Sequence, residues 1–128
     1  MRKITTNSAP KAIGPYSQGI SIGTLAFVSG QTPIDPETGA LAPGGMTEQA
    51  DQACRNVRAV LEAVGSSMER VVKTTCFLHD MADFQTFNAV YERYFVSCPA
   101  RSCVAVKGLP KDGLCEIEAI ALTGEADA

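Results

Sequence analysis

The 128-residue sequence predicts an α+β domain in which two helices cover one face of a mixed β-sheet. Segments with alternating or β-branched side chains flank two segments whose apolar residues recur every three or four positions. The two patterns do not alternate strictly along the chain, which favours an α+β arrangement over repeated β-α-β units. The composition, 45% hydrophobic and 20% charged, is ordinary for a globular chain. Because no linker or repeat interrupts it, we expect one domain over residues 1–128.

The N-terminal part predicts an arm, a hairpin and a loop. Residues 3–18 read as an extended arm or short strand that ends in a turn at Gly14-Pro15. Ile20–Ile22 and Leu25–Ser29 then form a hairpin around a Gly23-Thr24 turn. A loop rich in Pro, Gly and Asp follows over residues 32–45.

Two helices and the strand between them come next. Thr47 is the expected cap of a helix that runs to Val64, and Gly65 is its expected stop. Val71–Leu78 is a strand by its β-branched content. The second helix begins at Asp80 or Asp83 and ends near Phe95. Each helix carries one apolar stripe: Ala50, Ala53, Val57, Leu61 and Val64 on the first, and Phe84, Phe87, Tyr91, Tyr94 and Phe95 on the second.

Two C-terminal strands carry the residues with the most chemical interest. They are Pro99–Val104 and Leu114–Ala121, joined by a turn with two Gly and a Pro. The period of two places Arg101 and Cys103 on one face of the first strand, and Glu116 with Glu118 on one face of the second. If the two strands pair, a guanidinium and a carboxylate share one surface of the sheet. Such a pair either holds a small anion beside a proton-transfer group or is a structural ion pair.

The face that carries Glu116 and Glu118 also carries Ile120 and Leu122. A half-apolar surface of this kind is unfavourable in water, so we expect it to be covered by self-association.

Charge and cysteine content exclude several functions. The net charge of −3 and the scattered Lys and Arg disfavour nucleic acid as a partner. The chain has five Cys without a Cys-x-x-Cys pair and one His, His79, so we expect no metal. Residues 1–7 lack an apolar signal-peptide core, and no apolar run reaches membrane-spanning length. We therefore expect a cytoplasmic protein without a membrane contact.

The motif Pro99–Ser102, followed by Glu116–Ala121, resembles the reactive intermediate deaminase A (RidA) family, also called the YjgF or liver perchloric-acid-soluble protein family. Further segments resemble the family in the same order: Ala12–Gly19, Val28–Pro33, Asp35–Gly39, Val72–Thr75 and Asp83–Tyr91. The resemblance extends from about Lys11 to Leu122.

This resemblance implies a chorismate-mutase-like homotrimer with its sites in the clefts between subunits. It implies hydrolysis of 2-imino acids to 2-keto acids and ammonia without a cofactor. Arg101 is the expected clamp for the substrate carboxylate, and Glu116 the expected group that positions the water, with Glu118 as its neighbouring competitor. The other expected substrate-binding residues are Tyr16, Ser29, Gly30, Asn88 and Cys103.

Other interpretations of these residues stay open. Cys103 would be a nucleophile only with a base, for which His79 is the one imidazole. Cys98 and Cys115 depart from the family pattern beside Pro99 and Glu116, which can alter the size of the pocket and its sensitivity to oxidation. Alternative functions are a trimeric sensor of 2-keto acids, a chaperone, or an endoribonuclease, which the acidity of the chain disfavours.

Overall fold

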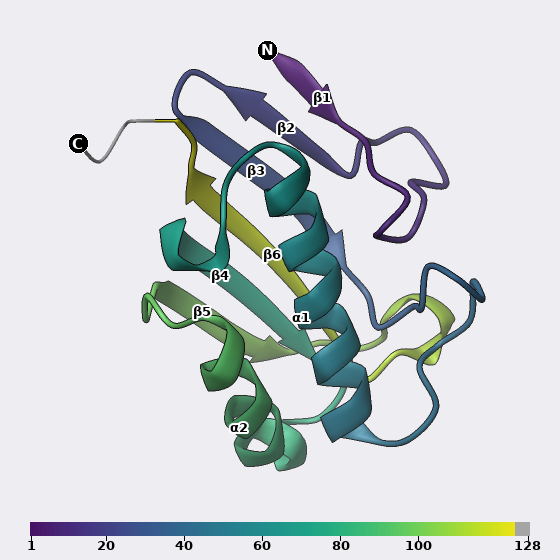
Figure 1. The fold of residues 1–128 in the computed structure, drawn as a ribbon. Helices are drawn as coiled ribbons and strands as arrows, with labels where there is room; N and C mark the ends of the chain where they lie inside the picture. Colours follow the sequence, from purple (N-terminus) through teal and green to yellow (C-terminus); the bar gives the residue numbers. More distant parts are fainter. Residues whose placement is uncertain (125–128) are drawn as a thin grey trace.

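The computed structural model describes residues 1–124 and consists of one six-stranded sheet with two α-helices on one of its faces (Figure 1). The predicted fold class is confirmed. Residues 125–128 of the expected domain lie outside the described residues. The elements in chain order are β1 (Arg2–Ile4), β2 (Gly19–Ile22), β3 (Leu25–Gln31), α1 (Met46–Ala63), η1 (Met68–Arg70), β4 (Val71–Leu78), η2 (Met81–Asp83), α2 (Phe84–Tyr94), β5 (Ala100–Ala105), η3 (Pro110–Asp112) and β6 (Cys115–Leu122). Neither α-helix in this part of the chain is long and apolar enough to cross a membrane.

Local signals place most element boundaries correctly. β4 has the predicted bounds, and Gly65 stands just after α1 with a left-handed φ of +80°. The start of α1 differs from the prediction, since Gly45 rather than Thr47 is the N-cap. The reason is local: the Glu48 carboxylate reaches back and accepts a hydrogen bond from the Gly45 N–H at 2.8 Å.

The strand order is β1-β2-β3-β6-β4-β5, and β4 and β5 are the only parallel neighbours among the described strands. The expected pairing of the two C-terminal strands is therefore wrong, because β4 lies between β5 and β6. The cause is the connection through α2. A strand, a helix and a parallel strand form a crossover unit, which places β5 directly beside β4 at the sheet edge. The chain then returns to insert β6 on the other side of β4.

The hydrophobic core lies between the helices and the sheet. On β6, every second residue is buried against the helices: Cys115, Ile117, Ala119 and Ala121. The predicted stripe of α1 meets them, with Ala50, Ala53, Val57 and Leu61 fully buried. Phe87, Tyr91 and Phe95 of the second stripe are buried as well.

The opposite face of the sheet carries no helix (Figure 1). Glu116, Glu118, Ile120 and Leu122 lie on it, as the period of two predicts. Large apolar side chains from three other strands share this face and stay exposed: Ile22 (54%), Phe27 (39%) and Val104 (46%). We call this surface the open face.

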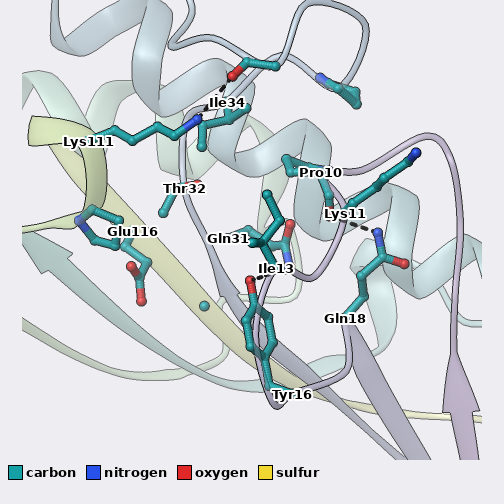
Figure 2. A pocket seen from close by; sticks show the side chains of 14 residues that line it. Pro10, Lys11, Ile13, Tyr16, Gln18, Gln31, Thr32, Ile34, Lys111 and Glu116 are labelled. Carbon is teal, nitrogen blue, oxygen red and sulfur yellow. Dashed lines mark hydrogen bonds between the residues drawn. The ribbon is translucent and has the colours of Figure 1, made fainter.

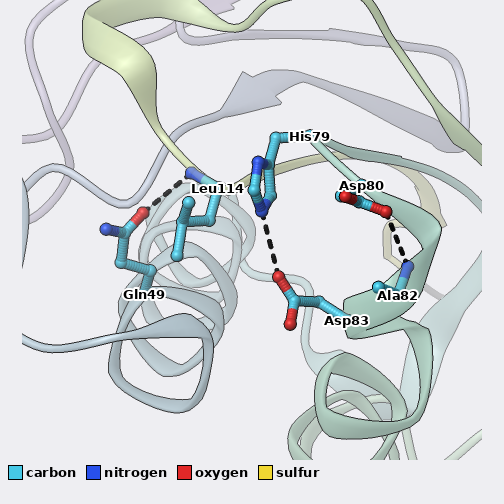
Figure 3. Close-up of polar contacts among 6 residues, drawn as sticks. All are labelled: Gln49, His79, Asp80, Ala82, Asp83 and Leu114. Carbon is cyan, nitrogen blue, oxygen red and sulfur yellow. Dashed lines mark hydrogen bonds and ion pairs between the residues drawn. The ribbon is translucent and has the colours of Figure 1, made fainter.

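Two buried amide side chains connect α1 to distant segments. Asn56 is fully buried, and its Nδ2 donates to the carbonyl oxygens of Thr32 and Ile34 at 2.9 Å each. Gln49 accepts a hydrogen bond from the Leu114 N–H at 2.8 Å, as Figure 3 shows. These bonds fix the loop after β3 and the start of β6, and both segments lead into the site described below.

Candidate functional site

A pocket of about 620 Å³ opens beside the start of β6 and contains Glu116. Its wall is formed by the N-terminal arm, the end of β3, the following loop and the η3 turn. Figure 2 shows Tyr16 and Glu116 around the same hollow, with Ile13 and Gln31 above the Tyr16 ring. Lys11 also lines the pocket, but its amino end extends away from Glu116.

Gly30 determines where the Glu116 carboxylate lies. A Cβ atom at residue 30 would overlap the Glu116 side chain, so any larger residue there would displace the carboxylate. Gly30 also lies where the pairing of β3 with β6 is interrupted, between Val28 and Gln31. Such a bulge redirects side chains and is common beside functional sites. Gly30, predicted to belong to the site, therefore has a geometric role: the absence of a Cβ atom leaves room for the Glu116 carboxylate.

The environment of Glu116 alters its acidity. Burial raises the pKa of this carboxyl above its ordinary value, and the negative charge of Glu118 on the same face raises it further. A carboxyl in this state gives up its proton at a higher pH than a free Glu and is a stronger base once ionised. Glu116 therefore has the properties expected of a general base or water-positioning group.

Tyr16 reaches the pocket from the turn that follows Gly14. Its hydroxyl accepts a hydrogen bond from the Ile13 N–H at 3.4 Å, and 55% of the residue is exposed. Ser29 does not line this pocket: its Oγ donates to the Ser17 carbonyl oxygen at 2.6 Å. Ser29 instead lines a smaller hollow on the open face. The structure therefore brings Tyr16, Gly30 and Glu116 together, and Ser29 supports the residue next to Tyr16.

Gln18 and Lys111 are among the pocket residues that sequence reasoning missed. Gln18 is buried, and its side chain accepts from the Thr6 N–H at 2.7 Å and donates to the Pro10 carbonyl oxygen at 2.8 Å, which holds the arm along the pocket. Lys111, with a left-handed φ of +56°, donates through Nζ to the Gly39 carbonyl oxygen at 3.2 Å (Figure 2). The one signal in the sequence was the polar side chain of Gln18, directly before the apolar strand β2.

Arg101 lies on the other side of the sheet from Glu116. Its guanidinium donates to Asn88 Oδ1 at 2.7 Å and lies over the rings of Tyr91 and Phe84, with Cζ 4.8 and 5.5 Å from their centroids. Tyr91 is fixed in turn by a hydrogen bond of 2.7 Å between its hydroxyl and that of Thr74. Asn88, predicted to bind substrate, is thus placed to hold Arg101.

The prediction that Arg101 and Glu116 lie on the same face of the sheet is therefore wrong for a single chain. Arg101 is opposite Thr74 in the parallel β4–β5 pair, on the face that α2 covers. Glu116 is opposite Phe77 in the β4–β6 pair, on the open face. The two side chains point to opposite faces of the sheet.

Cys103 shares the face of Arg101, and its thiol is not set up as a nucleophile. Burial raises the pKa of the Cys103 thiol, and Arg101 only partly opposes this rise. His79, the imidazole considered as its base, lies 3.0 Å from Asp83 Oδ2 at the start of α2 (Figure 3). Asp80 accepts from the Ala82 N–H in the same turn, so this segment is a helix-start structure.

Metal ligation is not supported by the described part of the chain. Residues 1–124 contain no group of three or more His, Cys, Asp or Glu side chains arranged to hold a metal ion. The pocket offers the Glu116 carboxyl and the Tyr16 phenol, while the Arg101 guanidinium lies on the other side of the sheet.

The fold and these groups define a small α+β protein with a carboxylate pocket on one side of its sheet and an arginine backed by aromatic rings on the other. The family model described as Endoribonuclease L-PSP matches residues 6–123. The chain belongs to this family, which confirms the resemblance to RidA and YjgF proteins.

Curated relatives and solved structures agree with this assignment. The chain is 52% identical to a RutC family protein of Pyrococcus abyssi, over 92% of this chain and 94% of that protein. It is 50% identical to the 2-iminobutanoate/2-iminopropanoate deaminase of Salmonella typhimurium, over 94% of this chain and 97% of that protein. The crystal structure of Escherichia coli TdcF with bound serine superposes with a TM-score of 0.92 at 44% identity, covering 97% of this chain and all of that one (100%).

Proposed function

We propose that this protein is a hydrolytic deaminase that converts 2-imino acids, such as 2-iminobutanoate and 2-iminopropanoate, to 2-keto acids and ammonia, at sites that two subunits build together. The observation that carries the proposal is the separation of the two key groups. Arg101 and Glu116 face opposite sides of the sheet in one chain, and only a second copy can bring them together. The chemistry is taken from the name of the Salmonella relative.

In the proposed site, Arg101 binds the substrate carboxylate through two parallel hydrogen bonds. Asn88 and the rings of Phe84 and Tyr91 hold its guanidinium in a fixed plane, so little side-chain entropy is lost on binding. This places the C=N carbon of the substrate beside Glu116 of the neighbouring subunit.

Glu116 then positions a water molecule and accepts its proton as the oxygen attacks the imine carbon. As the C–O bond forms, the C=N π electrons move to the nitrogen, which takes the proton held by Glu116 and gives a tetrahedral carbinolamine. Glu116 then accepts the hydroxyl proton and returns it to the nitrogen, so that the C–N bond breaks, the C=O bond forms, and the products are the 2-keto acid and ammonia. In this proposal, Tyr16 hydrogen-bonds the nitrogen or the intermediate, and Cys103 contributes backbone and pocket wall. Ser29 acts indirectly, through its bond to Ser17 beside Tyr16. An imine is already electrophilic, so positioning supplies most of the catalysis.

The assembly we propose is a homotrimer in which the open faces meet at the centre. Ile22, Phe27 and Val104 would leave water there, and half-buried Ile20, Phe77 and Ile120 lie on the same face. The number of subunits follows the family resemblance. We place the protein in the cytoplasm, where its free cysteines, three of them fully buried, remain reduced.

Imine hydrolysis tests the proposal directly. A threonine dehydratase generates 2-iminobutanoate, and the formation of 2-ketobutanoate is followed with wild-type protein, Arg101→Ala and Glu116→Gln. We expect wild type to accelerate the step and both variants to lose about 100-fold or more. Arg93→Ala, which removes an exposed arginine of α2, is the matched control and keeps wild-type activity.

The same wild-type and variant proteins are used to test the alternative functions. A folded wild type that binds 2-keto acids through Arg101 without turnover would replace the enzyme with a sensor. Protection of client proteins that survives Arg101→Ala would indicate a chaperone. Cleavage of single-stranded RNA without imine hydrolysis would favour the activity named in the family description.

A further inference from the structure

Four of the five cysteines lie on the helix-facing side of the sheet or on the helix that covers it. Cys76, Cys103 and Cys115 stand on β4, β5 and β6, and Cys54 faces them from α1. Cys54, Cys76 and Cys115 are fully buried, whereas Cys103 is partly exposed. The mechanism above uses none of the buried thiols.

Cys76 and Cys103 are direct partners in the parallel β4–β5 pair. Neighbouring strands lie about 4.8 Å apart, which is within the roughly 4.4 to 6.8 Å between Cα atoms that a disulfide spans, and the edge strand must move slightly toward β4 to bring the Cβ atoms within about 4.5 Å. Both side chains are on the face that α2 covers, since Thr74 and Arg101, two residues before them, meet α2 there. Cys115 is opposite Leu78 and is therefore offset from Cys76 by two residues.

The geometry points to Cys76 and Cys103 as a redox modification site, in which the accessible Cys103 thiol is oxidised and the buried Cys76 thiol closes a reversible disulfide with it. Arg101 precedes Cys103 by two residues on the same face of β5, so the pair lies beside the Arg101 side chain. The disulfide itself does not depend on the proposed function. Only its effect on catalysis does.

The oxidant required is a peroxide, with hydrogen peroxide as the simplest. It converts the Cys103 thiol to a sulfenic acid and is reduced to water. The Cys76 sulfur then attacks the sulfenic sulfur: the S–S bond forms, the S–O bond breaks, and the Cys76 proton leaves with the oxygen as water. A dithiol reductant returns both thiols. Because burial disfavours both thiolates, the reaction needs excess peroxide and is slow.

The bond would also affect the candidate site. Cys103 is two residues from Arg101 on the same face of β5, and the disulfide would draw this part of the edge strand toward β4. We expect deaminase activity to fall in proportion to the oxidised fraction and to return after reduction.

The experiment treats the purified protein with hydrogen peroxide, blocks free thiols under denaturing conditions and identifies cross-linked peptides by mass spectrometry. Because the exposed Cys98 thiol is oxidised on its own, thiols are counted in Cys98→Ser protein, where we expect free thiols to fall from four per chain to two, with one intrachain cross-link between Cys76 and Cys103. In Cys76→Val, no cross-link forms and Cys103 proceeds to sulfinic acid. Cys98→Ser, which changes an exposed thiol outside the pair, retains the cross-link, as does Cys115→Ala.

Two results would overturn the inference: oxidation of wild-type Cys103 to sulfinic acid without a cross-link, or a cross-link of Cys103 to Cys54 or Cys115 in place of Cys76. Thiol counts and cross-links do not require turnover, so they decide the inference even if the protein fails to hydrolyse imines.

Discussion

Gly30 and Glu116 form the contact on which the geometry of the carboxylate pocket depends. A side chain at residue 30 has no space because the Glu116 carboxylate occupies it. The absence of a Cβ atom is thus a requirement of the site rather than of the turn, since the φ of Gly30 lies outside the left-handed region.

We predict that Gly30→Ala lowers kcat/KM for imine hydrolysis by about 10- to 100-fold, because the carboxylate moves away from the water it positions. The thermal midpoint should change little. Gly108→Ala is the control, since a Cβ atom there meets nothing within 4 Å. Wild-type activity in Gly30→Ala would show that the position of Glu116 does not limit the reaction.

Glu118 gives a second prediction at this scale, through charge. Its carboxylate raises the pKa of Glu116, so Glu118→Gln should lower that pKa. The base form of Glu116 then persists to lower pH, and the acid limb of the profile of kcat/KM against pH shifts in the same direction. The profile of Glu62→Gln, an exposed change on α1, should match wild type. A shift of the Glu118→Gln limb to higher pH would contradict the assignment of Glu116 as the base.

At the scale of elements, α1 organises the pocket through amide side chains as well as through its apolar stripe. Asn56 holds the loop after β3, and part of that loop, Thr32 and Ile34, lines the pocket. The position of α1 therefore fixes the part of the loop that lines the pocket.

We expect Asn56→Ala to lower the free energy of unfolding by about 2 to 4 kcal/mol, since two buried carbonyl oxygens lose their donor. Urea denaturation measures this loss. Arg55→Ala, on the exposed side of the same helix, removes only a surface ion pair with Asp51 and should cost less than about 1 kcal/mol. Equal losses in the two variants would mean that the loop does not depend on Asn56.

The strands also show how much of the fold can be predicted from the sequence. The period of two on β6 correctly separated Glu116 and Glu118 from the buried Ile117, because burial of one sheet face is a local signal. No local signal showed which strand pairs with β5, because the crossover through α2 determines this pairing. The prediction that Arg101 and Glu116 share one surface was wrong for the same reason.

The supporting amides were missed for a related reason. The carbonyl partners of Asn56 lie 22 and 24 residues away in the sequence, and those of Gln18 lie 8 to 12 residues away. The family resemblance implied that Ser29 lines the pocket, but its hydroxyl donates to the Ser17 carbonyl oxygen and lies outside it. Residue type suggested the chemistry of the site, whereas the fold shows that Arg101 and Glu116 lie on opposite faces of the sheet.

At the scale of the whole molecule, the exposed open face and the separation of Arg101 from Glu116 both point to association with a second subunit. A single chain leaves Phe27, Val104 and Ile22 exposed, and it also leaves Glu116 without a guanidinium. The proposed assembly through this face would cover the apolar side chains, and a site shared between subunits would bring Arg101 and Glu116 together. In a symmetric ring, each contact repeats identically, so every interface would carry one complete site.

Subunit complementation tests this central claim most directly. Arg101→Ala and Glu116→Gln subunits are mixed, unfolded and refolded together, and imine hydrolysis is compared with that of each variant refolded alone. Random reassembly of a ring with shared sites restores about one quarter of the sites, because each needs an intact Arg101 from one chain and an intact Glu116 from the next. A matched mixture of wild type with the Arg101→Ala/Glu116→Gln double variant should also give about one quarter, whereas sites within single chains would give about one half. Recovery of activity in the first mixture would establish the shared site; activity no higher than that of the separate variants would contradict it.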